Sequence, residues 1–490
     1  MKILNQLPFE VTKIRNSTLI ITLLISFMIG IWFGRYRVEI EAWILLLPIL
    51  LSPVIIKRSI TSLIIIILIG LSLGLVRGQL AFEELSRFDS LIGRNVTLTG
   101  KVLDDASYDN RGLTEFHINQ VYQDGRKLPG KMRISGHVSP YGVERGDQVK
   151  IIGKVNQGFG SYQASISFAQ IIVTSRQDTI ISRARNRFFA SIYTVLPEPQ
   201  ASLGLGFLIG LRALLPEDLL IHLSRTGLTH IVAVSGYNLT ILVRVSRRSF
   251  MKISKFSATA ISVGLILLFL MFTGLAPSIF RASIVAAFAL AAWYYGRPIR
   301  PMMLLGLSGA ITAGINPFFI WFDVGWWLSF TAFFGVLVLA PVFTERFFQK
   351  TGKELFLPLQ IAIETTCAQI MALPIIMVIF GDLSIMSVIA NILVVPFIPV
   401  AMLATFVAGL SGIIVPALAG WIAIPATIIL VAMSSIIVML SNISWALISI
   451  HIDWSIVVAW YCAILFVYWL IQRKLTAKQR LSVLNTNVFD

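Results

Sequence analysis

Long apolar runs recur along the chain, and they constrain its fold more than any other feature. The first runs cover residues 18–34, 42–56 and 60–76, and a second series occupies most of residues 200–472. A transmembrane helix needs about 20 predominantly apolar residues. Only 13% of the 490 residues are charged, which is too few to cover the surface of a soluble protein. The sequence therefore predicts a polytopic α-helical membrane protein.

Basic residues in the short connecting loops predict how the chain is oriented. Lys13 and Arg15 precede the first run, and Lys57 and Arg58 join the second run to the third. Further basic segments are 244–255, 296–301, 345–353 and 473–480. Loops rich in Lys and Arg face the cytoplasm, so alternation predicts about 12 spans with both termini cytoplasmic. The same rule accounts for much of the net charge of +16 without nucleic acid.

The second membrane block, residues 200–475, contains several segments that we expect to be broken or re-entrant. Its expected spans lie near residues 229–244, 257–275, 279–296, 302–315, 325–342, 356–379, 384–412, 416–444 and 455–472. Segment 201–216 is short and glycine-rich, and Pro374, Pro396 and Pro399 interrupt later runs. Non-helical backbone at membrane depth is tolerated only where protein or a watery cavity surrounds it.

Residues 85–176, which follow the three N-terminal spans of segment 1–84, show a period of two instead. Five strand-like runs are separated by turn sequences such as QDGR and ERGD. These runs are 95–105, 114–123, 127–138, 147–157 and 162–174. Five short strands suit a small closed β-barrel of the OB-fold type, whereas an immunoglobulin-like sandwich would need about seven. Because the third span ends on the outer side, we expect an extracytoplasmic OB-fold-like domain.

Basic and aromatic residues are interleaved in this β-domain. Such a pattern is typical of single-stranded nucleic acid binding, because cations follow the phosphates and rings stack on bases. The candidate contacts are Lys101, Arg111, Arg126, Lys131, Arg133, Tyr108 and Tyr122. Acidic residues in the same stretch offset much of the charge, so an ordinary solvated surface is the alternative. His117 and His137 have no metal-ligating neighbours and are interpreted as structural.

A basic segment at residues 177–199 joins the β-domain to the second membrane block. Arg183, Arg185 and Arg187 precede Phe188, Phe189 and Ile192. This pattern predicts an amphipathic helix lying in the membrane interface. Residues 476–490 are then a cytoplasmic tail.

One apolar segment, LTHIVAVSGYNLTILV at 228–243, holds several polar residues in its middle. On a helix, His230 and Asn238 lie about 80° apart around the axis, and Ser235 lies about 60° beyond Asn238. Polar residues in spans usually face the bundle interior and mark a pathway. The candidate path residues are Arg212, Arg225, His230, Ser235, Gly236, Asn238, Arg281, Glu364 and Gln369. The alternatives are interhelical hydrogen bonding, an Arg281 side chain extended to the interface, and an interfacial Glu364.

The segment GLTHIVAVSGYNLTIL (227–242), preceded by LGLGFLIGLRALLPEDL (203–219), resembles the signature of the ComEC family of bacterial DNA-uptake channels. GLAPSIFRASIV (274–285), WWLSFTAFFG (326–335) and the stretch 368–400 continue the resemblance in order. The resemblance implies a channel that translocates single-stranded DNA across the cytoplasmic membrane during natural transformation. It also implies an extracytoplasmic DNA receptor and a cytoplasmic helicase-like motor or single-strand-binding protein as partners, beside the membrane lipids.

Two departures from the family pattern stand out. Asn238 occupies a position where the family usually has histidine, which removes protonation but keeps hydrogen bonding. The chain ends about 20 residues after its last span, so we expect no C-terminal metallo-β-lactamase-like nuclease domain.

No feature of the sequence predicts an enzyme or a cofactor. Five scattered histidines and two cysteines inside apolar runs match no metal spacing, and no GxxxxGK[ST] loop is present. Ser235 lies in AVSGY rather than in a GxSxG elbow, which argues against intramembrane hydrolysis. The stronger alternative to a DNA channel is a secondary transporter or flippase for another anionic or glycan-bearing substrate, since broken helices near the midplane are typical of transporters.

Overall fold

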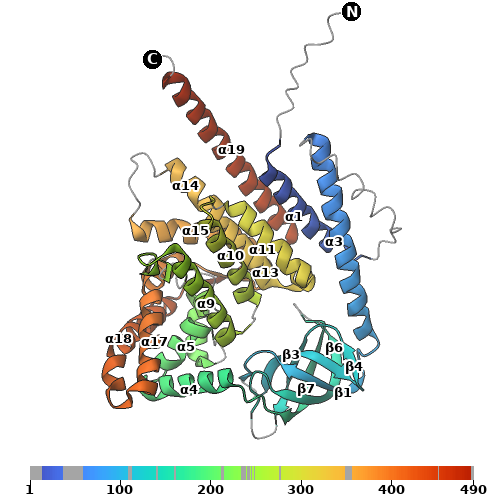
Figure 1. Ribbon diagram of the computed structural model, residues 1–490, viewed down its shortest axis with the longest axis vertical. Helices are drawn as coiled ribbons and strands as arrows, with labels where there is room; N and C mark the ends of the chain where they lie inside the picture. The colour runs from blue at the N-terminus through green and yellow to red at the C-terminus, as the bar shows by residue number, and fades with distance from the viewer. Residues whose placement is uncertain are drawn as a thin grey trace, which may run out of the picture.

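The structure is a computed structural model in which a bundle of helices carries a small β-sheet domain at one end (Figure 1). It describes residues 14–36, 59–108, 113–138, 142–158, 162–210, 214–232, 239, 243, 246–247, 249–274, 277–298, 300–347, 356–450 and 452–486.

Within these residues, eight helical segments are long and apolar enough to cross a membrane. They are α1 (Asn16–Phe33), α3 (Ile60–Asp89), α9 (Lys255–Thr273), the run from α13 (Val324–Phe334) to α14 (Ala340–Phe347), α15 (Leu357–Ile379), the run from α16 (Ser387–Val394) to α17 (Ile398–Ile414), α18 (Pro416–Ser441) and α19 (Trp454–Thr486). The shorter apolar helices are α5 (Gln200–Ile209), α10 (Pro277–Tyr294) and α11 (Pro301–Ile315). The prediction of a helical membrane protein is confirmed. The expected span 42–56 and most of 229–244 lie outside the described residues.

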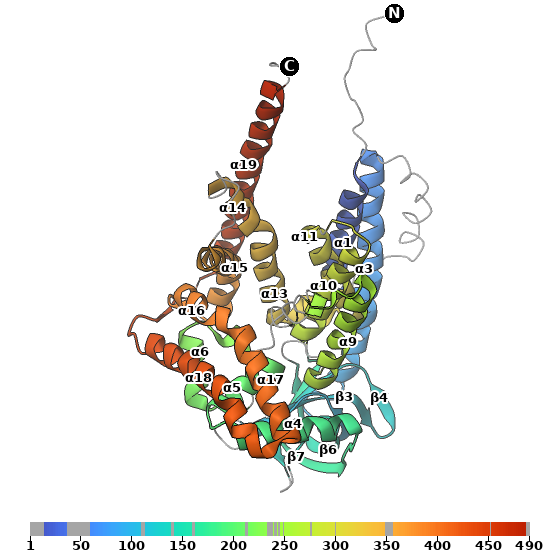
Figure 2. The ribbon, with the colours of Figure 1, turned by 60° about the vertical axis from the view of Figure 1, so that its left-hand side comes forward.

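Helices α1 and α3 pack through glycines that leave no room for a side chain. A Cβ atom on Gly34 of α1 would lie 2.6 Å from the Cα of Gly78 on α3. A Cβ atom on Gly74 would collide with the carbonyl oxygen of Phe27, and one on Gly30 with that of Leu71. Small residues at four-residue spacing are typical of close helix contacts in membranes. This pair forms one wall of the bundle (Figure 2).

Helix α3 continues 13 residues past the end of the expected span, from residue 76 to Asp89, and enters the β-domain. Phe88 at its end is fully buried in the core of that domain. The domain therefore continues a membrane helix without an intervening linker.

Among its described residues the β-domain has seven strands, and each of the five predicted runs overlaps one of the five long strands. These are β1 (Asn95–Val102), β3 (Thr114–Gln123), β5 (Met132–Val138), β6 (Gln148–Gln157) and β7 (Ala164–Ser175), with short strands β2 (Ser107–Tyr108) and β4 (Arg126–Leu128) paired to β3. The pairings β1–β6, β6–β7, β7–β5, β5–β3 and β3–β1 close a ring. Only β5 and β7 are parallel in this ring. The sheet is therefore a closed five-stranded barrel with two additional short strands.

Helix α4 (Ile180–Val195) occupies the predicted amphipathic segment and lies across the end of the bundle beside the barrel (Figure 1). Its buried Phe188 and Ile192 pack against α17, where a Cβ atom on Gly409 would contact both. Ser191 Oγ donates a hydrogen bond to the Gly409 carbonyl oxygen at 2.7 Å. Part of its apolar face is therefore covered by protein.

The proline interruptions were predicted with mixed success. The interpretation of Pro374 as an interruption is wrong, because α15 continues through it from Leu357 to Ile379. At Pro396 the prediction is confirmed: α16 ends at Val394, a 3₁₀ turn covers Val395–Phe397, and α17 follows. An unpredicted π-helical turn, Gly335–Leu339, lies between α13 and α14. There a Cβ atom on Gly335 would collide with the Cys367 carbonyl oxygen, so the irregular turn accommodates close contact with α15.

The molecule has two ends, and the barrel lies at one of them. The first residues of α1 and the last residues of α19 lie at the end opposite the barrel (Figures 1 and 2). The loop between α10 and α11 lies toward that same end (Figure 2).

Candidate functional site

The outer face of the barrel over β1, β3 and β5 carries several of the predicted basic contacts. Lys101 of β1 is paired with Asn119 of β3, and His117 of β3 is paired with Arg133 of β5. Lys101, His117 and Arg133 point away from the barrel core, because the residues on both sides of each along its strand are buried.

Two carboxylates balance part of the charge on this face. The Arg133 guanidinium donates to both oxygens of Glu115, from Nε at 2.5 Å and from Nη2 at 2.7 Å. Asp104 accepts a hydrogen bond from the His117 backbone at 2.9 Å and lies 2.5 Å from its Nδ1. The His117 ring also stacks on Tyr162 with 4.1 Å between centroids. His117 therefore has the structural role that the sequence predicted.

Lys131, which directly precedes β5, connects this face to the membrane helices. Burial lowers the pKa of the Lys131 ammonium, while the carboxylates of Asp104 and Asp323 act in the opposite direction. Asp323 lies in the bundle, between α12 (Phe318–Phe322) and α13, and its Oδ1 accepts a hydrogen bond from the Trp326 backbone at 3.0 Å. Lys131 therefore lies close enough to the bundle for the Asp323 carboxylate to act on it.

Arg281 of α10 is the membrane-side cation near the same carboxylate. It is 3% exposed, and its Nη2 donates to the Gly325 carbonyl oxygen at 3.1 Å. Its Nε and Nη1 are buried without a hydrogen-bond partner among the described residues. A buried guanidinium with unsatisfied N–H groups is costly, so this position favours an anion or water beside it. The structure does not show the Arg281 side chain extended to the interface.

Lys131, Asp323 and Arg281 form one polar cluster, and Arg225, His230 and Gln369 form a second. Arg225 ends helix α6 (Glu217–Arg225), and its carbonyl oxygen accepts a hydrogen bond from Ser384 Oγ at 2.8 Å. Gln369 Nε2 donates to the Ser384 carbonyl oxygen at 3.2 Å. Ser384 belongs to β8 (Asp382–Ser384), which pairs with β9 (Leu447–Ser449). The Nε of Arg225 is buried without a partner among the described residues.

Within the second cluster, His230 belongs to α7 (Thr229–Val232). Its Nδ1 is 2.9 Å from the Gly227 carbonyl oxygen, and its ring interacts with the Asn391 side chain. The imidazole is accessible to water although protein atoms surround it densely.

The other predicted residues fall into two groups, those that the structure describes and those that lie outside the described residues. Glu364 accepts a hydrogen bond from Gln360 on the same helix at 2.8 Å, and no described contact joins it to either cluster. Arg126 and Tyr122 lie on the β3–β4 hairpin. Arg212, Ser235, Gly236, Asn238 and Arg111 lie outside the described residues, as does the side chain of Tyr108.

Sequence reasoning pointed to Asn391 as a polar residue facing the bundle interior, but it did not place Ser384 and Ser387 in the site. Asn391 Nδ2 donates to the Ser387 carbonyl oxygen at 2.7 Å, and a Cβ atom on Gly227 would lie 2.8 Å from the Ser387 Cβ. The four-residue spacing of Ser387 and Asn391 within an apolar run was the available signal, because it puts both on one helix face. Among the described residues, no group of three or more His, Cys, Asp or Glu side chains could hold a metal ion.

Comparison with known proteins places this arrangement in a family. A family model described as Competence protein matches residues 207–474, more than half of the chain. The chain belongs to the Competence protein family. This confirms the resemblance drawn from the sequence. The Competence region contains Arg225, His230, Arg281 and Gln369, whereas the barrel precedes it.

One curated relative is similar to part of the chain. ComE operon protein 3 of Bacillus subtilis (strain 168) is 27% identical over 227 residues, which are 46% of this chain and 28% of that protein. The match therefore spans little more than a quarter of the relative's length. No solved structure matches the chain.

Proposed function

We propose that this protein is a channel that translocates single-stranded DNA across the cytoplasmic membrane during natural transformation. The observation that carries the proposal is that Lys131 of the barrel and Arg281 of the bundle lie near one carboxylate, Asp323. A polyanion crosses a membrane only along a wet path with hydrogen-bond donors and positive charge. A phosphate group arriving between barrel and bundle would find cations from both.

The barrel would receive the strand as an OB-fold. The closed ring of five strands with one parallel pair supports that assignment. OB-folds bind oligonucleotides on the face of their second and third strands and through neighbouring loops. Here those strands are β3 and β5, and Lys131, which interacts electrostatically with Asp323 of the bundle, directly precedes β5. The described candidates for contacts are Lys101, Arg126, Lys131, Arg133 and Tyr122, and Arg111 and Tyr108 complete the set.

The path would continue past the second polar cluster. Arg225, His230 and Gln369 supply hydrogen-bond donors there, and Asn391 adds a side-chain amide. Arg212, Ser235, Gly236, Asn238 and Glu364 are proposed to line the same path.

The orientation follows from the two ends of the molecule. The basic segments 296–301 and 473–480 belong to the end away from the barrel, which we assign to the cytoplasm. The barrel and α4 then face outward, where a DNA receptor would deliver the strand. A helicase-like motor or single-strand-binding protein would draw it into the cytoplasm.

Uptake of labelled DNA by a deletion strain tests the proposal. We expect no labelled DNA in the cytoplasm of the deletion strain and restoration by the wild-type gene. Arg281→Gln should reduce uptake on the order of tenfold, since a hydrogen bond to a charged group contributes about 1.5–3 kcal/mol. Arg473→Gln, an exposed arginine at the opposite end, is the matched control. Normal transformation of the deletion strain would overturn the proposal.

A secondary transporter or flippase for another anionic or glycan-bearing substrate is the second candidate, favoured by the break between α16 and α17. Growth of the deletion strain on candidate solutes distinguishes it from a DNA channel. We further propose that the protein is not an enzyme. Hydrolytic activity should therefore be undetectable in the wild type, and Ser235→Ala should not change this.

A further inference from the structure

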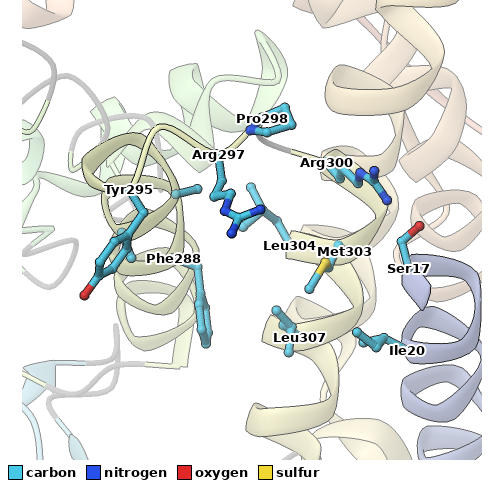
Figure 3. A pocket seen from close by; sticks show the side chains of 12 residues that line it. Ser17, Ile20, Phe288, Tyr295, Arg297, Pro298, Arg300, Met303, Leu304 and Leu307 are labelled. Carbon is cyan, nitrogen blue, oxygen red and sulfur yellow. The ribbon is translucent and has the colours of Figure 1, made fainter. Parts of the chain in front are cut away.

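A groove between α1, α10 and α11 opens at the end of the molecule away from the barrel (Figure 3). It encloses about 480 Å³ and is walled by apolar side chains such as Ile20, Phe288, Leu304 and Leu307. It lies outside both polar clusters. A polar or aqueous ligand would find almost no partner along these walls.

Two arginines stand at the mouth of the groove. Arg297 comes from the loop after α10, and Arg300 directly precedes α11. Figure 3 shows Arg297 extending into the space between these helices and Arg300 directed toward Ser17 of α1. Both side chains are exposed and have no ion pair within the described part of the chain.

The elements that build the groove cannot neutralise these charges. Residues 14–36, which contain α1, and residues 277–316, which contain α10 and α11, include no Asp or Glu. Two further cations lie at the same end of α10 but on its other face, toward α9, because Arg247 and Lys255 both sit over the Trp293 ring, at 5.0 and 5.5 Å. Aromatic rings and basic residues together are typical of the membrane–water interface. The mouth is therefore a positive site at headgroup depth above an apolar trough.

We propose that this groove binds an anionic phospholipid, with an acyl chain along the apolar walls and the phosphodiester between Arg297 and Arg300. Basic pockets between transmembrane helices on the cytoplasmic side bind anionic lipid headgroups by this combination. Inorganic phosphate could use the arginines but would leave the trough empty. A nucleic acid would likewise have no use for the apolar walls. The bound lipid would tie α1 to the α10–α11 pair.

Lipid retention by the purified full chain tests the site. The protein in neutral detergent is incubated with an equal mixture of dioleoyl phosphatidylglycerol and dioleoyl phosphatidylcholine, and bound lipid is counted by native mass spectrometry. Phosphatidylglycerol should be retained in preference to phosphatidylcholine. Arg297→Gln and Arg300→Gln should each lower that preference about fivefold. Ala291→Phe, which fills the trough and keeps both charges, should also release the lipid.

The matched control is the double variant Arg346→Gln/Arg473→Gln. It removes two positive charges, one more than either groove variant, from exposed side chains outside the groove, where each guanidinium lies over its own aromatic neighbour. Its lipid preference should equal that of the wild type, and elution by size exclusion checks that every variant is folded.

Three results would overturn the proposal. Equal retention of the two lipids by the wild type would show that charge plays no part. Loss of preference in the control double variant would show diffuse attraction rather than a site. Displacement of phosphatidylglycerol by inorganic phosphate or by a single-stranded oligonucleotide at equal concentration would assign the arginines to a different ligand. Each readout is independent of DNA uptake.

Discussion

Different forces stabilise the barrel and the helical bundle. In the barrel, apolar side chains are removed from water: Phe116 and Ile134 are 1% and 0% exposed. In the bundle, apolar side chains cover the outside as well, as Leu267 and Phe466 show with exposures of 55% and 59%. Because lipid tails are as apolar as Leu, packing such residues between helices gains little hydrophobic free energy.

The helices are joined instead by close backbone approach and by hydrogen bonds between helices. Gly74 lets α3 contact the α1 backbone, Trp321 Nε1 donates to the Ile31 carbonyl oxygen at 2.9 Å, and Arg77 Nε donates to that of Gly314 at 2.7 Å. The barrel should therefore be sensitive to volume removed from its core. The bundle should be sensitive to volume added at its helix contacts.

Adding volume at the α1–α3 contact should have the largest effect. Gly74→Leu would drive a side chain into the Phe27 carbonyl oxygen and the Ile31 backbone, which cannot move aside. We expect the free energy of unfolding to fall by about 3 kcal/mol or more. The measurement is the yield of monodisperse full-length protein after detergent extraction.

The matched control adds the same volume where it meets nothing. A Cβ atom on Gly264 of α9 has no neighbour within 4 Å, so Gly264→Leu should be extracted at the wild-type yield. Equal yields of the two variants would show that the α1–α3 contact does not depend on its glycines.

Removing volume from the barrel core should have an effect of comparable size. Phe116→Ala leaves a cavity in a closed core and should cost about 3–5 kcal/mol. The same change at lipid-facing Phe466 should cost far less, because lipid fills the space. Hydrogen exchange of β3 and β5 in the full chain measures the first effect. Protection unchanged in Phe116→Ala would contradict a hydrophobically stabilised barrel.

The same contrast explains what could be predicted from the sequence. In β1 the burial alternates residue by residue, so the period of two was visible and the five strands were found. In α9 apolar residues face both protein and lipid, so the sequence shows a span but not its contacts. The continuous α15 at Pro374 depends on neighbouring helices that no local pattern reveals. Likewise, contacts between distant residues, such as Ser384 with Arg225, are set by tertiary structure.

The contact between α4 and the barrel should make a smaller contribution to stability. Arg185 of α4 donates to both carboxylate oxygens of Asp105 in the barrel, and the side chains are 9% and 27% exposed. Removing one partner of a buried pair costs about 3–5 kcal/mol, and the partial exposure of Asp105 should reduce this to about 2 kcal/mol for Arg185→Ala. Faster hydrogen exchange in α4 and around Asp105 is the readout.

Arg183 provides the control for that joint. It pairs with Asp178 at exposures of 66% and 70%, so Arg183→Ala should cost at most about 1 kcal/mol. If both variants exchange alike, the Arg185–Asp105 pair does not hold the barrel against α4.

The smallest effect concerns Lys131, where the two regions meet. Burial lowers the pKa of this ammonium despite the opposing carboxylates of Asp104 and Asp323. Between the lowered pKa and the ordinary value, the unfolded chain binds the proton and the folded chain does not, so stability should rise with pH in that window. Below the window both states are protonated, and the folded state carries the cost of the buried charge. Lys131→Gln should remove this part of the rise in the thermal midpoint of the full chain, whereas Lys154→Gln, at an exposed position of β6, should retain it. A Lys131→Gln profile parallel to the wild type would mean that Asp104 and Asp323 compensate the burial of this cation in full, and that a carboxylate rather than an incoming phosphate already satisfies it.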